Sequence, residues 1–238
     1  MTDKVFKWLN DNFYNLFVVL LFFLNVVPIA APFLLHYDIT IPSKAIYFVY
    51  SFFCHQQHCK SLHIFDHQYA WCTRDMFIWG SIFIMAVLGK KEKFPPLSLR
   101  WLVIYSLPIA LDGGIQTIAA IIGYESGNPF YVSNNFFRMV TGSIFGMALG
   151  LYIFPRLKEV LLAEKEGVVG ESRPPNRAGN MPRGIMLLLM GFMALVYVLL
   201  IGIWDVTSTS FRPFNWLDSR THIPSVKEEW FMRRQTGI

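Results

Sequence analysis

Long apolar runs, each about the length of a membrane span, constrain this chain more than any other feature. Four of them cover residues 13–35, 99–124, 134–154 and 184–204. A helix needs roughly 20 mostly apolar residues to cross about 30 Å of hydrocarbon. Hydrophobic residues make up 54% of the 238-residue chain. A soluble domain of this length would not collect so many of them in unbroken runs. The sequence therefore predicts an all-α, polytopic transmembrane helical bundle.

A shorter apolar run brings the predicted number of spans to about five. It covers residues 75–89 and is closed by Lys90 and Lys91. Residues 45–53 are also apolar but cover only about half a span. They form either a half-helix that dips into the outer leaflet or an extension of the following loop. If they crossed fully, the count would be six.

The spans divide the chain into four parts. We expect a four-span core over residues 1–154, with a polar loop at 54–75. A charged, Gly- and Pro-containing linker follows at 155–183, then a fifth span at 184–204 and a polar tail at 205–238.

Basic residues indicate the orientation of the spans. Alternate flanks carry twelve Lys and Arg residues on one side and nine on the other; five of the nine belong to the tail, and most of these lie well beyond the membrane edge. Cytoplasmic flanks are richer in Lys and Arg. We therefore expect a protein of the cytoplasmic membrane with its N-terminus inside and the 54–75 loop outside. The net charge of +5 does not predict nucleic-acid binding, because the basic residues flank the spans.

The 54–75 loop concentrates residues that bind metals. It holds all three cysteines, Cys54, Cys59 and Cys72, and four of the six histidines, including His55 and His58. Thiolate and imidazole are the usual ligands of zinc and other transition metals. The spacing contains no Cys-x-x-Cys, so a standard zinc knuckle is not indicated. A metal or redox site, a structural disulfide, and a packing or docking surface without chemistry all remain open.

Polar residues also occur inside the predicted spans. Asp112 lies near the middle of one span, where a carboxylate costs at least about 2.5 kcal/mol and must pair, become protonated or face water. Gln116 shares its helical face, one turn away. Arg138 lies in the first turn of the next span and is one conceivable partner of Asp112. These residues either hold spans together or form an ion, proton or ligand site.

Glycines recur every fourth residue in the span at 134–154. Gly142, Gly146 and Gly150 form the small-xxx-small pattern that allows helices to pack closely. The pattern predicts a helix-packing face, either against another span of this chain or against a partner subunit.

Four short motifs together resemble a family of prokaryotic predicted membrane proteins of unknown function. They are Cys54-His55-Gln56, Cys72-Thr73-Arg74-Asp75, Asp112-Gly113-Gly114-Ile115-Gln116, and Ser133 to Arg138. The resemblance covers about residues 45–155. The family pattern is Cys-His-Gln, Cys-x-Arg-Cys, Asp-Gly-x-x-Gln and Ser-x-Asn-x-x-Arg.

The resemblance implies one shared site but no known reaction. Its members here would be Cys54, His55, Cys72, Arg74, Asp112, Gln116, Asn135 and Arg138. The chain departs from the pattern where Asp75 replaces the second cysteine of Cys-x-Arg-Cys. This departure has three possible explanations: Asp75 acts as a carboxylate ligand, Cys59 supplies the missing thiol, or an ancestral metal site has been lost.

Three functions are consistent with these features. The first is a metal-binding or redox-linked site made by Cys54, His55, Cys72 and Asp75, with Cys59 and His58 in reserve. The second is an accessory subunit of a larger respiratory or photosynthetic membrane complex, alongside other membrane subunits in the lipid bilayer. The third is a small transporter that uses Asp112. No Ser/His/Asp arrangement or zinc-protease helix indicates a hydrolase.

Overall fold

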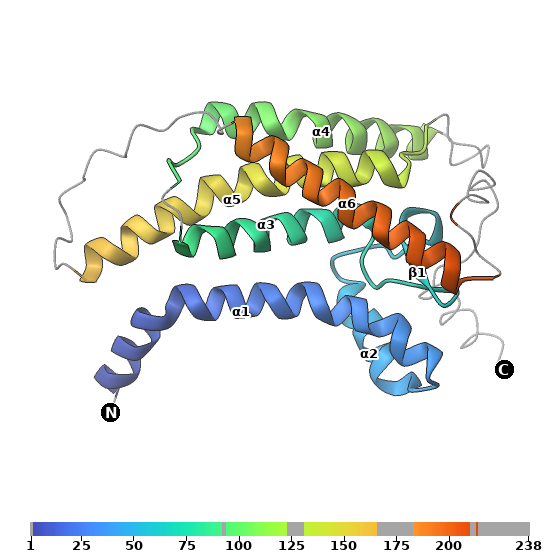
Figure 1. Ribbon diagram of the computed structural model, residues 1–238, viewed down its shortest axis with the longest axis horizontal. Helices are drawn as coiled ribbons and strands as arrows, with labels where there is room; N and C mark the ends of the chain where they lie inside the picture. The colour runs from blue at the N-terminus through green and yellow to red at the C-terminus, as the bar shows by residue number, and fades with distance from the viewer. Residues whose placement is uncertain (1, 92–93, 123–130, 166–182, 210–212, 214–238) are drawn as a thin grey trace.

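The structure, a computed structural model, describes residues 2–91, 94–122, 131–165, 183–209 and 213. Six α-helices make up most of this described part (Figure 1). They are α1 Thr2–His36, α2 Thr40–Tyr50, α3 Thr73–Lys91, α4 Leu99–Ile122, α5 Asn135–Lys165 and α6 Arg183–Thr207. Between α2 and α3 lie a 3-10 turn, η1 His58–Lys60, and two short antiparallel strands, β1 His63–Ile64 and β2 His67–Gln68.

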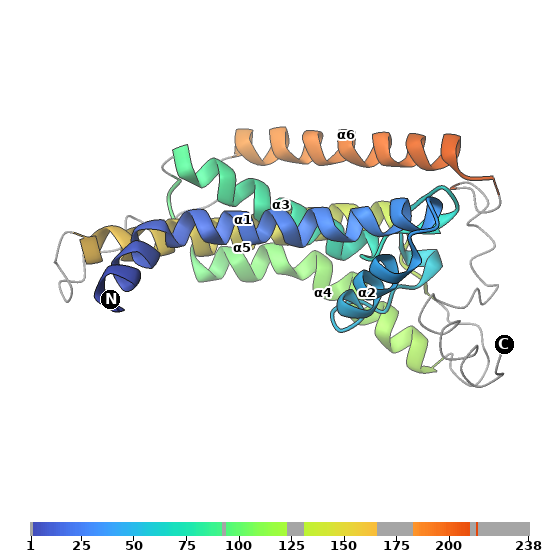
Figure 2. The same ribbon diagram turned by 90° about the horizontal axis from the view of Figure 1, so that it is seen from below.

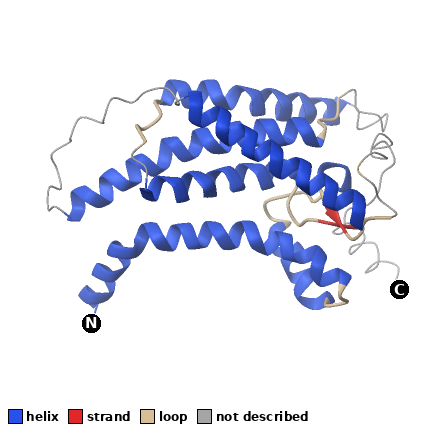
Figure 3. Cartoon of the chain, viewed as in Figure 1, coloured by secondary structure: helices blue, strands red, loops and turns tan. Residues whose placement is uncertain are grey.

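Helix α3 lies at the centre of the bundle and packs most extensively against α5. Helix α4 covers α5, helix α1 packs on α3 and α2, and α6 rests on α5 and the strand β1. Figures 1 and 2 show the long helices running roughly along the longest axis of the molecule. Figure 3 shows how little of the described chain is strand. Met85, Met147 and Leu151 are fully buried between α3 and α5.

Within the described part of the chain, four helices are long and apolar enough to cross a membrane. They comprise residues Asp11–His36, Leu99–Ile122, Asn135–Leu161 and Gly184–Thr207. Large apolar side chains on α4 and α6, such as Leu111 and Leu188, are exposed to the surroundings, as expected of residues that contact lipid. The predicted all-α helical membrane protein is confirmed. The shorter run at 75–89 forms α3, a helix of 19 residues that is not among the four.

Several boundaries differ from the predicted ones. The half-helix expected at 45–53 begins earlier and is α2, Thr40–Tyr50. Helix α5 continues beyond Phe154 to Lys165, so the linker expected from 155 begins as helix. Residues 166–182 of that linker, and the tail beyond 209 except residue 213, lie outside the described residues.

A tight hairpin links the polar loop to α6. Phe65 and Asp66 join β1 to β2 with φ angles of 54° and 61°, as a two-residue turn between twisted strands requires. The Asp66 carboxylate accepts hydrogen bonds from the backbone N–H and the hydroxyl of Thr209, and the Phe65 N–H donates to the Thr207 hydroxyl. The loop tip therefore lies at the C-terminal end of α6.

Candidate functional site

Two thiols and a carboxylate converge where α3 begins. Cys54 follows α2, Cys72 directly precedes α3, and Asp75 lies in the first turn of α3. One ligand atom from each, the two Sγ atoms and a carboxylate oxygen, lies within 4.8 Å of the others. A tetrahedral zinc ion with Zn–S bonds of about 2.3 Å holds two sulfurs about 3.8 Å apart. Only a small contraction would therefore close this set around an ion.

Local hydrogen bonds hold this thiol–carboxylate cluster (Cys54, Cys72 and Asp75) in place. The backbone N–H groups of Cys72 and Gln56 donate to Cys54 Sγ, with N···S distances of 3.1 and 3.4 Å. The Cys72 thiol donates to Asp75 Oδ2 at 3.1 Å. Gln56 has φ 51°, a left-handed conformation that folds the chain back over Cys54. The three cysteines are free thiols, so the disulfide alternative is not what the structure contains.

The other predicted metal ligands lie outside the cluster. The His55 side chain is exposed to the surroundings. Cys59 lies in η1, and neither residue belongs to the group whose ligand atoms converge. His58 instead faces His63, with 3.1 Å between His58 Nδ1 and His63 Nε2. The structure thus brings together Cys54, Cys72 and Asp75.

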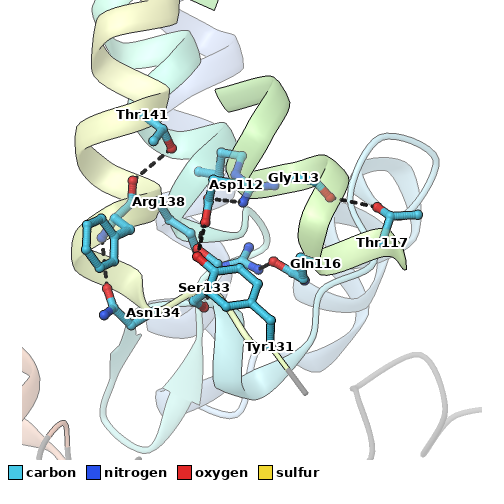
Figure 4. Close-up of polar contacts among 11 residues, drawn as sticks. Asp112, Gly113, Gln116, Thr117, Tyr131, Ser133, Asn134, Arg138 and Thr141 are labelled. Atoms are coloured by element: carbon cyan, nitrogen blue, oxygen red, sulfur yellow. Dashed lines mark hydrogen bonds and ion pairs between the residues drawn. The ribbon is translucent and has the colours of Figure 1, made fainter. Parts of the chain in front are cut away.

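A second group of polar residues surrounds Asp112 (Figure 4). Its carboxylate, only 8% exposed, forms an ion pair with the Arg74 guanidinium. It also accepts hydrogen bonds from the Tyr131 hydroxyl at 2.6 Å and the Ser133 hydroxyl at 2.9 Å. These three donors compensate the carboxylate for the loss of water, because buried charges require paired, hydrogen-bonded partners.

Arg138 and Gln116 form the other half of this network. Arg138 is 2% exposed; its Nε donates to the Ser133 carbonyl at 3.1 Å, and its Nη2 donates to Gln116 Oε1. Ser133 therefore links the two halves through its hydroxyl and its carbonyl. The suggestion that Arg138 pairs with Asp112 is wrong: the ion pair is made by Arg74, one residue before Asp75.

Asn135 ties α5 to the start of α3. Its Oδ1 accepts a hydrogen bond of 2.9 Å from the Thr73 hydroxyl, and both residues are buried. Because Cys72, Thr73, Arg74 and Asp75 are consecutive, one helix start connects the thiol–carboxylate cluster to the Asp112 network. Thr73 and Tyr131 were not among the predicted site residues, because a single hydroxyl-bearing residue forms no recognisable motif by itself.

Glycines bring α3 and α5 close enough for these contacts. A Cβ atom on Gly142 would lie 2.7 Å from the Arg74 carbonyl oxygen, and one on Gly150 would lie 2.6 Å from Met85 Cβ. A Cβ on Gly146, between them, would meet the Ile78 carbonyl and Ser81. The partner of this stripe is thus another helix of the same chain.

A buried histidine leads to a prediction about pH. His63 is fully buried and packs against Trp204 of α6, with ring centroids 4.8 Å apart. Burial lowers the pKa of His63 well below its ordinary value, and the neighbouring His58 lowers it further. The unfolded chain therefore binds a proton on this residue below about pH 6.5, whereas the folded chain does not. Stability should decrease as the pH falls through that value, by at most about 1.4 kcal/mol per pH unit for one group.

Melting temperatures of the detergent-solubilised protein between pH 8 and pH 5 would measure this effect. The variant His63→Gln should show a flatter pH dependence than the parent chain. Equal slopes for the parent and the variant would show that other groups cause the acid sensitivity.

Comparison with known proteins places the chain in a family. A profile of the family "Predicted membrane protein (DUF2085)" matches residues 54–152, which include both polar groups. An uncharacterized protein of Methanocaldococcus jannaschii, MJ1492, is 31% identical over 123 residues, which are 50% of this chain and 72% of that protein. No solved structure matches the chain significantly. With its family-specific segment holding the cluster and the Asp112 network, the chain belongs to the DUF2085 family of predicted membrane proteins.

Proposed function

We propose that this membrane protein binds a transition-metal ion, zinc or a metal of similar preference, through Cys54, Cys72 and Asp75. The observation that carries the proposal is the approach of their three ligand atoms to within 4.8 Å of one another. Two thiolates and one carboxylate suit zinc or iron better than calcium or magnesium, which prefer oxygen ligands alone. Three protein ligands leave a fourth position for water or a further group, as in sites that carry out chemistry.

The neighbouring network supports this use of the cluster. Metal ligands generally require a second set of hydrogen-bonding residues that fixes their position. Here Thr73 and Arg74, which lie between Cys72 and Asp75, are held by Asn135 and Asp112 from two other helices. A ligand pair whose intervening residues are fixed in this way loses little conformational entropy when an ion binds.

Metal content tests the proposal. The purified parent protein should contain about one metal ion per chain, whereas Cys54→Ser and Cys72→Ser should contain much less. Cys59→Ser is the matched control, because it removes a thiol of the same loop outside the cluster and should keep the metal. Sub-stoichiometric metal in the parent protein as well as the variants would refute metal binding.

Substitutions at Asp75 test directly whether its carboxylate is a metal ligand. Asp75→Cys would restore the thiol that the family pattern has at this position, and it should retain or strengthen zinc binding because thiolates are the softer ligands. Asp75→Asn should weaken binding, since the amide carries no charge. Equal affinity in the two variants would exclude Asp75 as a ligand.

Mapping the state of the thiols distinguishes a redox role of the two cysteines from metal binding. If Cys54 and Cys72 instead cycle between thiol and disulfide, mass spectrometry of oxidised, alkylated protein should show them joined and metal-free. Reversible joining without bound metal would favour a redox role over a metal site.

We also propose that the end of the bundle opposite the cluster faces the cytoplasm. Basic side chains gather there: Arg156 donates to the Leu97 carbonyl, and Lys158 donates to the carbonyls of Gly89 and Lys90 at the end of α3. Cations beside helix C-termini are favourable, and their enrichment at one end is typical of the cytoplasmic side. Accessibility of Lys158 to an impermeant amine reagent in right-side-out vesicles would contradict this orientation.

A further inference from the structure

Helix α2 turns back along α1 instead of continuing away from it. The Ile39 N–H donates to the Leu34 carbonyl in the connection. The Ser43 hydroxyl donates to the Ala31 carbonyl at 2.8 Å. The Tyr50 hydroxyl donates to the Leu24 carbonyl at 3.2 Å. Tyr50 lies seven residues after Ser43 in α2, and Leu24 lies seven residues before Ala31 in α1, so the two helices run in opposite directions. Because Leu24 lies near the middle of the apolar segment Asp11–His36, α2 ends near mid-depth of that helix.

Helix α3 starts where α2 ends. The Trp71 indole, two residues before α3, also donates to the Leu24 carbonyl, at 3.2 Å. Further along, the Asn25 amide donates to the Trp79 carbonyl, and the Tyr14 hydroxyl donates to the Ala86 carbonyl at 2.7 Å. Helices α2 and α3 therefore accompany successive parts of α1, both antiparallel to it. In Figure 1, α2 lies at the right end of α1, and α3 lies along its middle and left.

The side of α2 turned away from the protein is mostly apolar, and the exposed Lys44 near the start of the helix is its one charged residue. Ser43, Tyr47 and Tyr50 are buried on one side of the helix. The opposite side and the turn that follows expose large apolar residues: Ile41 82%, Phe48 52%, Val49 52%, Phe52 73% and Phe53 68%. Helix α1, against which α2 packs, also exposes apolar side chains such as Phe33 and is long and apolar enough to span a membrane. With 11 residues, α2 is about 16 Å long and cannot cross about 30 Å of hydrocarbon.

Residue spacing gives the depth of the cluster. If Lys90 marks the inner boundary, Asp75 lies 15 residues higher on α3, or about 22 Å. If Arg100 marks it, Asp112 lies 12 residues higher on α4, or about 18 Å. Both distances are shorter than the hydrocarbon thickness of about 30 Å. The two polar groups are thus placed below the outer surface.

We propose that α2 and α3 are the two halves of one discontinuous membrane crossing, with the thiol–carboxylate cluster at the break and lipid acyl chains covering the exposed face of α2. The crossing then begins at the outer end of α1, is interrupted by residues 51–72 and is completed by α3. Together with the four long helices this makes five crossings.

Buried amides satisfy the backbone at the break, as a non-helical segment at membrane depth requires. Gln56 Nε2 donates to the Tyr47 carbonyl at 2.8 Å and to the Ala70 carbonyl at 3.2 Å. Gln68 Nε2 donates to the Gln56 carbonyl at 2.8 Å, and the Tyr47 hydroxyl donates to the Gln68 carbonyl. Both glutamines are 1% exposed. The last turn of α2 and the chain before α3 are therefore joined by side chains instead of by helix.

Spin labels on the full-length protein in liposomes would test the crossing. A ketone-bearing amino acid, p-acetylphenylalanine, replaces Ile41 or Phe52 and is coupled to a nitroxide, which leaves the native cysteines unchanged. Collision with oxygen, concentrated in the bilayer, is compared with collision with a water-soluble nickel chelate. Labels at Val206 and Val198, exposed at the end and nearer the middle of α6, calibrate depth within the same protein.

A discontinuous crossing predicts that the ratio of oxygen to nickel collisions rises several-fold from position 41 to position 52, as it does from 206 to 198. Equal, shallow values at 41 and 52 would mean that α2 lies flat on the surface and would overturn the proposal. Protection of position 52 from both reagents would show that protein, a second copy or another subunit, covers the face, and would overturn the lipid contact. The labels are read in metal-free protein, so the result does not depend on whether the cluster binds metal.

Discussion

Replacing Gly146 with alanine is expected to destabilise the protein by about 3 kcal/mol or more. The added Cβ would lie 2.8 Å from Ser81 Cβ and would collide with the backbone carbonyl of Ile78. A backbone carbonyl in the middle of α3 cannot rotate away as a flexible side chain can. Helices α3 and α5 would have to separate, and this would loosen the contact on which Arg74 and Asn135 depend.

Melting of the detergent-solubilised variant, followed by size-exclusion chromatography after heating, would measure the loss. Gly191→Ala in α6 is the matched control, because a Cβ there meets nothing within 4 Å. That control should be neutral or slightly stabilising, since alanine favours a helix by about 1 kcal/mol over glycine. Equal melting temperatures for the two variants would show that α3 and α5 are not in close contact at Gly146.

Replacing Arg74 with methionine should be comparably damaging, at about 3 to 5 kcal/mol. The change leaves the Asp112 carboxylate buried with its charge uncompensated, because Tyr131 and Ser133 supply hydrogen bonds but no positive charge. Desolvating an unpaired carboxylate is costly in protein and costlier in a membrane.

A second variant distinguishes loss of the charge pair from loss of packing. Adding Asp112→Asn to Arg74→Met removes the stranded charge, so the double variant should be more stable than the sum of the two single effects implies. Lys44→Met, at an exposed cation of α2, is the control and should change stability by less than about 0.5 kcal/mol. Strictly additive single and double effects would mean that Arg74 and Asp112 do not interact.

The Asp112 network shows where the sequence stops being informative. A carboxylate inside an apolar run requires a partner, and this need could be read from the chain alone. The partner could not, because Arg74 lies 38 positions earlier in another helix. Arg138 was the nearer candidate along the chain, yet it bonds Gln116 one turn away from Asp112. Which of two arginines meets the carboxylate depends on the rotation and height of α3 relative to α4, and neither is encoded locally.

The predicted ligands show the same division. Clustering of cysteine and histidine singled out the 54–75 loop, but composition cannot tell which of its residues converge. The fold of the loop turns Cys54 and Cys72 toward Asp75, while His55 is exposed and His58 faces His63.

The sequence by itself determined those features that depend on composition or on the regular spacing of residues. Apolar runs of span length require helices in a bilayer, because hydrocarbon offers no partners for backbone polar groups. The glycine spacing determined that one face of α5 packs closely. Only the tertiary structure decided that this face meets α3, that Arg74 pairs with Asp112, and that α2 returns along α1 to the start of α3. These outcomes depend on contacts between segments distant in the chain, whose geometry is set by the packing of the whole bundle.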